Sequence, residues 1–239
     1  MSDLNREPPL VTLCLATSLD GKISAKAGTA PNFTSRADLE KLFGLRAEAD
    51  ALLIGANTVR QEQLPPLVRQ EQRVAERLRL GKPEHPAAVI VSGSLDLPWE
   101  SAYFREKKQR IFILTASPKP EQSAIMKRLG LECLDTGGEI NLGLGLEMLG
   151  QRGYRKILAE GGGKLTHSLL AAGVVDRLFL TLAPLFIAGR QTPNLCHGEL
   201  LDPLPRFDLV ACHRVESELH LEYGARKKAR DTAETLPAS

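Results

Sequence analysis

The sequence has no long apolar run, few aromatic residues and almost no excess charge. Aromatic residues make up 5% of the 239 residues, and the formal net charge is +2. No run approaches the ~18 apolar residues that a membrane-spanning helix needs, and the first residues lack the apolar core of a signal peptide. The balanced charge argues against a polyanionic partner. Only the R-K-K-A-R segment near the C-terminus favours nucleic acid, and that signal is weak.

Cysteine is also scarce and scattered. The four cysteines form no C-x-x-C pair, so we expect reduced thiols in a cytoplasmic protein. No group of His and Cys has the spacing of metal ligands. There is no G-x-S-x-G elbow and no paired zinc-deaminase signature. The sequence therefore offers binding geometry without an evident nucleophile, and we expect a bound cofactor to carry the chemistry.

The most informative stretch runs from Ile157 to Leu170, I-L-A-E-G-G-G-K-L-T-H-S-L-L. A short apolar strand is followed by Glu160, three glycines and a helix whose leucines recur at helical spacing. Gly173 is a suitable residue to end that helix. Glycines between a strand and a helix allow backbone N–H groups to converge on an anion at the positive end of the helix. This pattern predicts a cradle for a pyrophosphate.

Two familiar phosphate motifs are excluded at this cradle. A P-loop would need glycine at Leu158 and Ser or Thr at Leu165, and a Rossmann fingerprint would need glycine at Thr166. Three glycines alone are equally compatible with a plain strand-to-helix turn. Glu160 favours the binding site, because phosphates would repel it toward donors on a second ligand.

A second strand–glycine–helix junction occurs earlier in the chain. The apolar run Ala51–Ile54 precedes Gly55, and Thr58 lies in the first turn of the helix that follows. Thr58 alone would be an ordinary helix-start threonine. Two such junctions in one chain favour a dinucleotide lying across the strand ends.

Arg46 lies near the end of the helix that precedes this junction. We expect that helix to be capped by Thr34 or Ser35, with Asp38 completing a capping box, and to run to about Glu48. Arg46 adjoins the apolar face of the helix. It is either a solvated arginine or an anion-binding residue.

The remaining pattern predicts an α/β fold with a largely parallel sheet covered on both faces. Expected strands are 10–17, 51–54, 87–91, 110–114, 132–134, 157–159 and 174–183, and an antiparallel hairpin formed by 207–215 and 219–223 closes the chain. Expected helices are 35–48, one starting near 56, a solvated charged one ending near 81, 121–129, 142–151 and 164–172. We predict one domain over residues 1–224 and a flexible polar tail over 225–239. The irregular segment 25–32 is either a loop over a site or a surface turn.

Four motifs in order resemble those of the pyrimidine reductases of riboflavin biosynthesis, which have a dihydrofolate-reductase-like three-layer α/β/α fold. The resemblance covers roughly Val11 to Gly189. The motifs are A-T-S-L-D-G-K-I at Ala16–Ile23, L-R-A-E-A-D-A-L-L-I-G-A-N-T-V at Leu45–Val59, L-A-E-G-G-G-K-L at Leu158–Leu165 and V-D-R-L-F-L-T-L-A-P-L-F-I-A-G at Val175–Gly189. Each is loose alone, but the four in this order and spacing are specific.

This resemblance implies an NADPH-dependent enzyme similar to 5-amino-6-(5-phosphoribosylamino)uracil reductase. Hydride would reach C1′ of the open imine form of a phosphoribosylamino-pyrimidine and give the ribitylamino-pyrimidine. The pyrimidine could be the deaminated or the still-aminated form. The resemblance also implies a homodimer.

Site residues are predicted on the same basis. Arg46 and Arg69 would hold the substrate 5-phosphate, for which a guanidinium is suited. Glu160 and Asp20 would also bind substrate, and Glu160 and Glu62 would be the catalytic residues. The predicted cofactor contacts are Ala16, Thr58, Glu62, Ser92, Gly161, Gly162, Gly163, Lys164, Leu165 and Thr166.

Two positions depart from the family pattern. Ala30-Pro31-Asn32 stands where members usually have Ser-x-Trp, and Glu62-Gln63-Leu64 where they usually have Asp-Asp-Pro. Both departures lie on the predicted substrate side, so the sequence defines the cofactor better than the substrate. A reductase of a related imine or pterin, or a nucleotide-binding relative without catalysis, are the alternatives.

Overall fold

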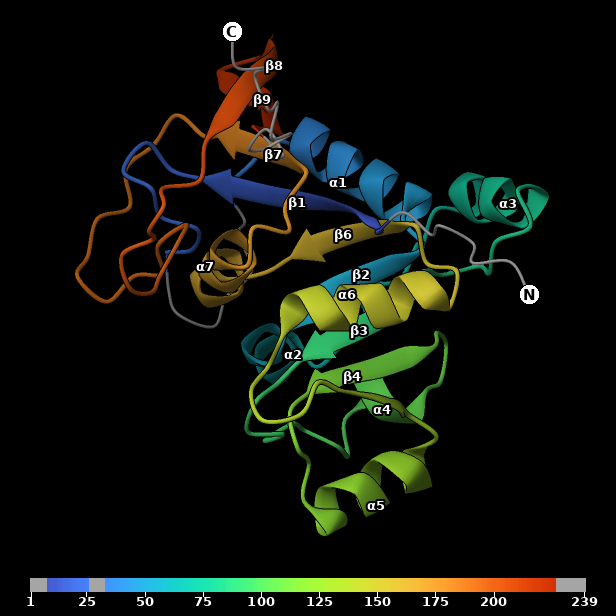
Figure 1. Cartoon of the computed structure of the whole chain (residues 1–239). Coiled ribbons are helices and arrows are strands. Elements are labelled where there is room, and N and C mark those ends of the chain that lie inside the picture. Colours follow the sequence, from blue (N-terminus) through green and yellow to red (C-terminus); the bar gives the residue numbers. More distant parts are fainter. Residues whose placement is uncertain (1–7, 26–32, 227–239) are drawn as a thin grey trace, which may run out of the picture.

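A mixed sheet of nine strands forms the centre of the molecule (Figure 1). The computed structural model describes residues 8–25 and 33–226. The strands, in sheet order, are β5 (Glu132–Asp135), β4 (Ile111–Thr115), β3 (Ala87–Val91), β2 (Ala51–Gly55), β6 (Lys156–Glu160), β1 (Leu10–Thr17), β7 (Arg177–Leu182), β9 (Glu218–Ala225) and β8 (Phe207–Val215). Strands β1 to β7 are parallel to one another, and β9 is antiparallel to both of its neighbours, β7 and β8. The predicted mostly parallel sheet with a C-terminal hairpin is confirmed.

Helices cover both faces of the sheet, as the three-layer prediction requires (Figure 1). The helices are α1 (Arg36–Glu48), α2 (Ala56–Glu62), α3 (Glu71–Arg79), α4 (Ala102–Arg105), α5 (Pro120–Leu129), α6 (Leu142–Gln151) and α7 (Gly163–Ala171). One apolar core packs the sheet against α6 and α7, and the other packs it against α1, α2, α4 and α5. No helix within residues 8–25 and 33–226 is long and apolar enough to cross a membrane.

The central strands read as apolar runs because both of their faces are covered. Leu52 and Leu53 point to opposite faces of β2, and both are fully buried. Burial of both faces was also predicted for β1, and that prediction is only half correct. Leu13 is buried, whereas Thr12 and Cys14 on the other face are half-buried. That face meets polar side chains of α1 instead of a purely apolar helix surface.

Four local predictions were wrong. Helix α4 was not predicted, and its buried Tyr103 and Phe104 show that it is part of the core. The charged helix α3 is not fully solvated, because Arg77 is 2% exposed. Strand β7 starts at Arg177, later than predicted, and the preceding Asp176 N–H donates to the Val11 carbonyl. The predicted tail begins one residue too early, since Ala225 is still in β9, and residues 227–239 lie outside the described part of the chain.

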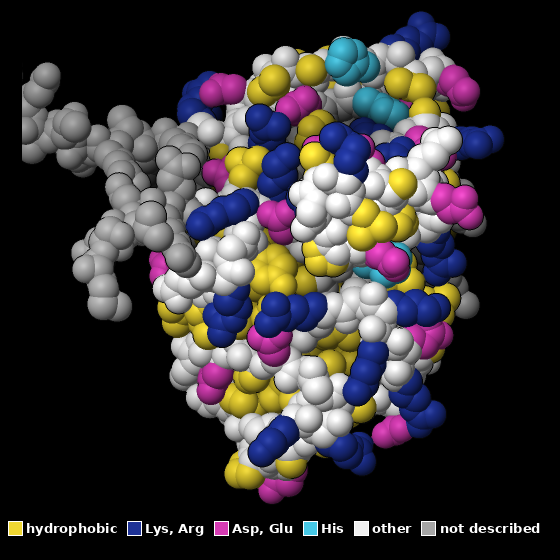
Figure 2. Space-filling model, turned by 90° about the vertical axis from the view of Figure 1, so that its right-hand side faces the viewer, with side chains coloured by type: hydrophobic (Ala, Val, Ile, Leu, Met, Phe, Trp, Pro, Cys, Tyr) yellow, Lys and Arg dark blue, Asp and Glu magenta, His cyan; other side chains and the backbone are white. Residues whose placement is uncertain are grey.

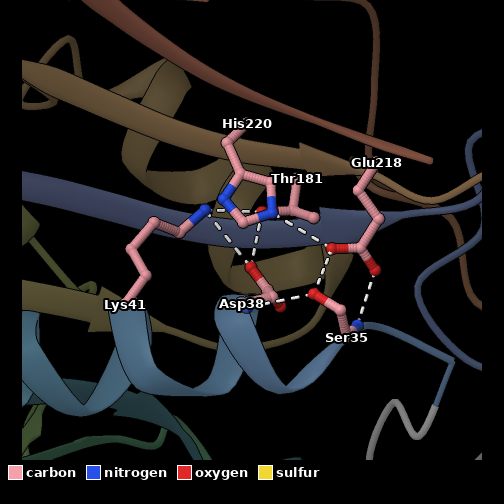
Figure 3. A network of polar contacts seen from close by, with 6 residues as sticks. All are labelled: Ser35, Asp38, Lys41, Thr181, Glu218 and His220. Carbon is pink, nitrogen blue, oxygen red and sulfur yellow. Dashed lines mark hydrogen bonds and ion pairs between the residues drawn. The ribbon is translucent and has the colours of Figure 1, made fainter. Parts of the chain in front are cut away.

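Helix α1 is fixed to the sheet by a polar network at its start (Figure 3). Ser35 is the N-cap, and its Oγ accepts from the Asp38 N–H, as predicted. The reciprocal half of the predicted capping box is absent, because Glu218 of β9 accepts from both the N–H and the Oγ of Ser35, each at 2.6 Å. Asp38 instead accepts from Thr181 of β7, and Lys41 donates to the same hydroxyl.

Glu218 is therefore a buried carboxylate held between a helix start and a strand. Burial alone raises its pKa, but the hydrogen bonds from Ser35 and the contact with His220, 3.0 Å away, outweigh burial and leave the pKa below its ordinary value. A carboxylate whose pKa is lowered on folding stabilises the fold above its unfolded pKa. That stabilisation is lost as the pH falls through the folded pKa.

We expect Glu218→Gln to destabilise the fold at neutral pH by about 1.5–3 kcal/mol, the usual value of a hydrogen bond to a charged group. The difference from wild type should shrink as the pH falls from 4.5, where the unfolded glutamate takes up its proton, down through the lower folded pKa, where the folded carboxylate is protonated as well. Urea unfolding at several pH values measures this. Glu216→Gln at the exposed hairpin turn is the control, and a difference that does not depend on pH would contradict the assignment.

Candidate functional site at the carboxyl edge of the sheet

The predicted cofactor residues follow adjacent parallel strands. Strands β3, β2, β6 and β1 are neighbours, so the segments that leave their carboxyl ends lie along one edge of the sheet. Ala16 is near the end of β1, Thr58 is in the first turn of α2, and Ser92 follows β3. The segment Gly161–Thr166 links β6 to α7. The strand arrowheads and α7 lie on the same side of Figure 1.

The two glycine junctions are in contact. A Cβ added to Gly161 would lie 3.7 Å from the backbone nitrogen of Gly55 and 3.2 Å from Cδ2 of Leu165. A Cβ added to Gly55 would lie 3.7 Å from Cβ of Leu165. Small residues at 55 and 161 therefore allow the two strand-to-helix turns to pack together over Leu165. The leucine is 7% exposed and belongs to the core beneath the turns.

The three glycines between β6 and α7 are not equivalent. Gly162 is the N-cap, and a Cβ added there would meet nothing within 4 Å. A Cβ on Gly163 would lie 2.3 Å from the carbonyl oxygen of Asn194, and the Gly163 carbonyl accepts from the His197 N–H at 2.9 Å. Gly162 is thus an open position at the start of the helix, whereas Gly163 is needed for the close approach of the 194–197 loop.

The junction fits an anionic group. The first N–H groups of α7 have no partner within the helix, and Gly162 leaves the space in front of them open. The Thr166 hydroxyl is buried and has no hydrogen-bond partner among the described residues. Lys164 is exposed in the same turn. By contrast, the buried Ser92 hydroxyl already accepts from the Leu95 N–H at 3.1 Å and holds the turn after β3.

Glu160 and Arg46 form a two-fold hydrogen-bonded ion pair. Arg46 Nε donates to Glu160 Oε1 at 2.7 Å, and Nη2 donates to Oε2 at 2.5 Å. Both side chains are largely buried, with 17% and 14% exposed. Burial lowers the pKa of Arg46, but the hydrogen bonds and charge of Glu160 outweigh it and leave the pKa raised. The pair uses two of five guanidinium N–H groups, so Arg46 keeps donors for a ligand.

A second carboxyl group and a phenol complete this cluster. Glu62 is an exposed residue, but partial desolvation of its carboxyl group raises its pKa; Arg46 lowers that pKa, and Glu160 raises it further. Tyr103 is 3% exposed, and its hydroxyl has no partner among the described residues. Its pKa is raised by burial, then by Glu160 and Glu62. Two carboxyl groups around one guanidinium form an acidic site that suits a ligand rich in hydrogen-bond donors.

Sequence reasoning missed Tyr103 and Cys14 at this cluster. Cys14 pairs in register with Glu160 on the neighbouring strand, so the two side chains share a face. Burial, followed by the charge of Glu160, raises the pKa of the Cys14 thiol to about 12. The thiol is therefore neutral near pH 7. Tyr103 could not have been found, because no periodic pattern marks the four-residue helix that carries it.

Two predicted substrate residues make no ion pair or hydrogen bond to the cluster within the described part of the chain. The Asp20 carboxylate accepts from Ser18 Oγ at 2.6 Å and from the N–H groups of Ile187 and Ala188 at 3.1 and 2.7 Å. These bonds, led by Ser18, hold its pKa at about 2. Asp20 thus ties the turn after β1 to the 187–188 loop. Arg69 is exposed between α2 and α3 and makes no ion pair with Glu160 or Glu62 in the described part of the chain.

A family model settles the relationship. The model described as the RibD C-terminal domain matches residues 9–221. The chain belongs to this family. The predicted family resemblance is therefore confirmed.

Several known proteins are similar to this chain over most of their length. The chain is 29% identical over 191 residues to the 2,5-diamino-6-ribosylamino-4(3H)-pyrimidinone 5′-phosphate reductase of Archaeoglobus fulgidus, covering 80% of this chain and 87% of that one. It is similar to the crystal structure of a pyrimidine reductase-like protein from Corynebacterium diphtheriae, with a TM-score of 0.80, 26% identity, and coverage of 93% and 94%. Dihydrofolate reductase from Enterococcus faecalis has a TM-score of 0.52 at 12% identity, with coverage of 91% and 97%, and shares the fold alone.

The unequal roles of the glycines predict unequal mutants. Gly163→Ala should destabilise the protein by about 1–3 kcal/mol, because the added methyl overlaps the Asn194 carbonyl. Gly162→Ala should be nearly neutral, since its backbone is extended (φ −78°) and the space is open. Thermal unfolding compares the variants, and hydrogen exchange of 194–197 should rise in Gly163→Ala alone. Equal effects would show that the two positions do not differ in packing.

Proposed function

We propose that the chain is an NADPH-dependent reductase that converts a phosphoribosylamino-pyrimidine into the ribitylamino-pyrimidine in riboflavin biosynthesis. The observation that carries this is the position of Glu160. The carboxylate ends β6 immediately before the open glycine junction, so an anion cradle and an acidic cluster adjoin on one strand. The named reductase activity of the Archaeoglobus fulgidus relative supports the same reaction class.

The cofactor would lie along the carboxyl edge of the sheet. Its pyrophosphate would bind at the Gly161–Thr166 turn, where α7 begins and the Thr166 hydroxyl has no partner among the described residues. Ala16, Thr58 and Ser92 lie at neighbouring strand ends and would border the rest of the molecule. When bound, the nicotinamide supplies hydride. The protein residues bind the phosphates, orient the ring and hold the substrate beside it.

The acidic cluster would receive the pyrimidine. Glu160, already bound to a guanidinium, is a hydrogen-bond acceptor and would anchor the amino and ring N–H groups of the substrate. Glu62 has the raised pKa and is the better proton donor to the imine nitrogen as hydride reaches C1′. The remaining N–H groups of Arg46, with Arg69, would bind the 5-phosphate. Asp20 would act indirectly, by holding the loops beside the site.

The assembly would be a homodimer in the cytoplasm. Strand β8 is at the edge of the sheet, and Leu209 and Val210 on it are 56% and 63% exposed. Adjacent apolar residues on an edge strand support burial against a second copy. The free state of the four cysteines is compatible with a reducing compartment.

An acid at position 162 tests the cofactor site. Gly162→Asp should weaken NADPH binding at least about tenfold, because its carboxylate would face the pyrophosphate. Gly162→Asn has nearly the same volume and also caps helices well, so it should bind NADPH much more tightly than the aspartate variant. Fluorescence titration with NADPH measures both. Equal affinities in the two variants would place the pyrophosphate elsewhere.

Substitutions of the two carboxyl groups should have different kinetic effects. Glu160→Gln should chiefly raise KM for the pyrimidine, whereas Glu62→Gln should lower kcat by about 10²–10⁴-fold if it is the general acid. Because the acid works when protonated, wild-type kcat should fall as the pH rises through the Glu62 pKa, and the amide variant should lose that limb. Steady-state kinetics across pH decides. A normal KM with collapsed kcat in Glu160→Gln would assign the acid to Glu160 instead.

A further inference from the structure

A cavity of about 650 Å³ lies at the opposite edge of the sheet, where the strands begin. Asp50 precedes β2, Ala87 opens β3, Arg110 precedes β4 and Tyr154 lies just before β6, and all four line the cavity. The proposed reductase site is at the other end of the same strands. The two regions are therefore separated by the length of the sheet, which is about 16 Å for a five-residue strand.

Positive charge dominates the lining. Its cationic residues are Arg77, Lys82, Lys107, Lys108, Arg110 and Arg152. Only Asp50 and Glu84 are acidic. Figure 2 views the molecule from this side and shows many Lys and Arg side chains around the hollows of the surface. The cavity is of the size that small-molecule sites usually have.

Arg77 is the most unusual residue in this cavity, because it is a buried cation without a carboxylate in contact. Its side chain is held by three carbonyls, with Nε donating to Pro83 at 2.8 Å and Nη1 to Ala47 and Ala49 at 2.7 Å each. It is 2% exposed, yet Nη2 has no hydrogen-bond partner in the described chain. A buried charged donor left unpaired is costly and rare. Its two free N–H bonds suggest that a partner belongs there.

Three more buried unpaired atoms belong to residues that line the same cavity. His85 Nδ1 and both the Nε2 and Oε1 atoms of Gln109 are buried and have no partner among the described residues. Half of the eight buried unpaired side-chain atoms in the described chain are thus found at this one place. Such clustering is expected where a polar ligand completes the hydrogen bonds.

Ion pairs neutralise only part of the lining. Lys82 pairs with Asp50 and Lys108 with Glu106, each at 2.7 Å, and Arg110 pairs with Glu132. Arg77, Lys107 and Arg152 have no acidic partner in the described part of the chain, and Glu84 is the single lining acid not paired with a cation. The cavity therefore has a surplus of cations that matches a ligand with about two negative charges.

We propose that this cavity binds a small phosphate-bearing molecule, with the phosphate held by Arg77, Lys107 and Arg152. A phosphate ester carries about −1.5 to −2 charges and several strong acceptor oxygens, which suits unpaired guanidinium and ammonium donors. Gln109 carries both a donor and an acceptor, and it belongs to the lining together with His85. The proposal does not depend on the reductase activity.

The test uses hydrogen exchange, because it locates the bound anion. The full chain in phosphate-free buffer is titrated with inorganic pyrophosphate and, separately, with ADP. Saturable protection of 77–85, 107–110 and 152–154 is expected with at least one of them. Tighter binding of ADP would show that the ligand is an organic phosphate, whereas equal or weaker binding would indicate a free inorganic anion. Sodium sulfate at equal ionic strength controls for nonspecific screening.

Paired variants make the outcome decisive. Lys107→Gln with Arg152→Gln removes two exposed cations of the lining. This double variant should lower the affinity for the anion, measured by protection of these segments, at least about tenfold. Arg105→Gln with Arg128→Gln removes two exposed cations outside the lining. This control should change the anion affinity less than about twofold. Arg77 is left intact, because the carbonyls that it holds belong to the fold. Protection confined to 161–166, protection equal in both double variants, or no saturable protection would overturn the proposal and leave a water-filled cavity.

Discussion

The parallel register of β2, β6 and β1 is the constraint on which the rest of the molecule depends. Glu160 is in register with Ile54 on one side and Cys14 on the other, so β2 and β6 end within one residue of each other, and β1 continues to Thr17 beside β7. Helices that return along a parallel sheet begin at this edge and end at the other. Backbone N–H groups of helix starts therefore gather at the carboxyl edge, and the glycine junctions at 55 and 161 touch there. The anion cradle is a consequence of strand order as much as of glycine.

The features that could be predicted from the sequence depend on residues close together in the chain. The contacts that could not be predicted join residues far apart in the chain. The buried run of β2, the Ser35 cap and the strand–glycine–helix junctions depend on residues within a few positions, and their patterns are visible in the sequence. The Arg46–Glu160 pair joins residues 114 apart, and the Asp20–Ala188 bond joins residues 168 apart. Only the folded sheet brings such partners together. The same reason explains why Arg77 in a charged helix was expected in solvent.

The opposite helix ends explain part of the positive charge at the amino edge. Carbonyl groups at helix ends lack partners, and cations there are favourable. Arg77 and Lys82 donate to the carbonyls of Ala47, Ala49 and Glu48 at the end of α1, and Arg152 donates to Met148 at the end of α6. These bonds account for why the cations are present. They do not account for the free Nη2 of Arg77 or for Lys107, which touches no helix carbonyl among the described residues.

The end of α1 links the two edges of the sheet. Arg46 pairs with Glu160 at the reductase site, and the next residue, Ala47, is held through its carbonyl by Arg77. At the other end of the helix, Ser35 is held by Glu218. A helix fixed at both ends can hold the Arg46 guanidinium opposite Glu160. Burying this ion pair costs free energy, which is offset only when the two groups keep good hydrogen-bond geometry. Arg77 lines the cationic cavity and also donates to the carbonyl of Ala47, the residue next to Arg46, so a single short segment of α1 contacts both regions.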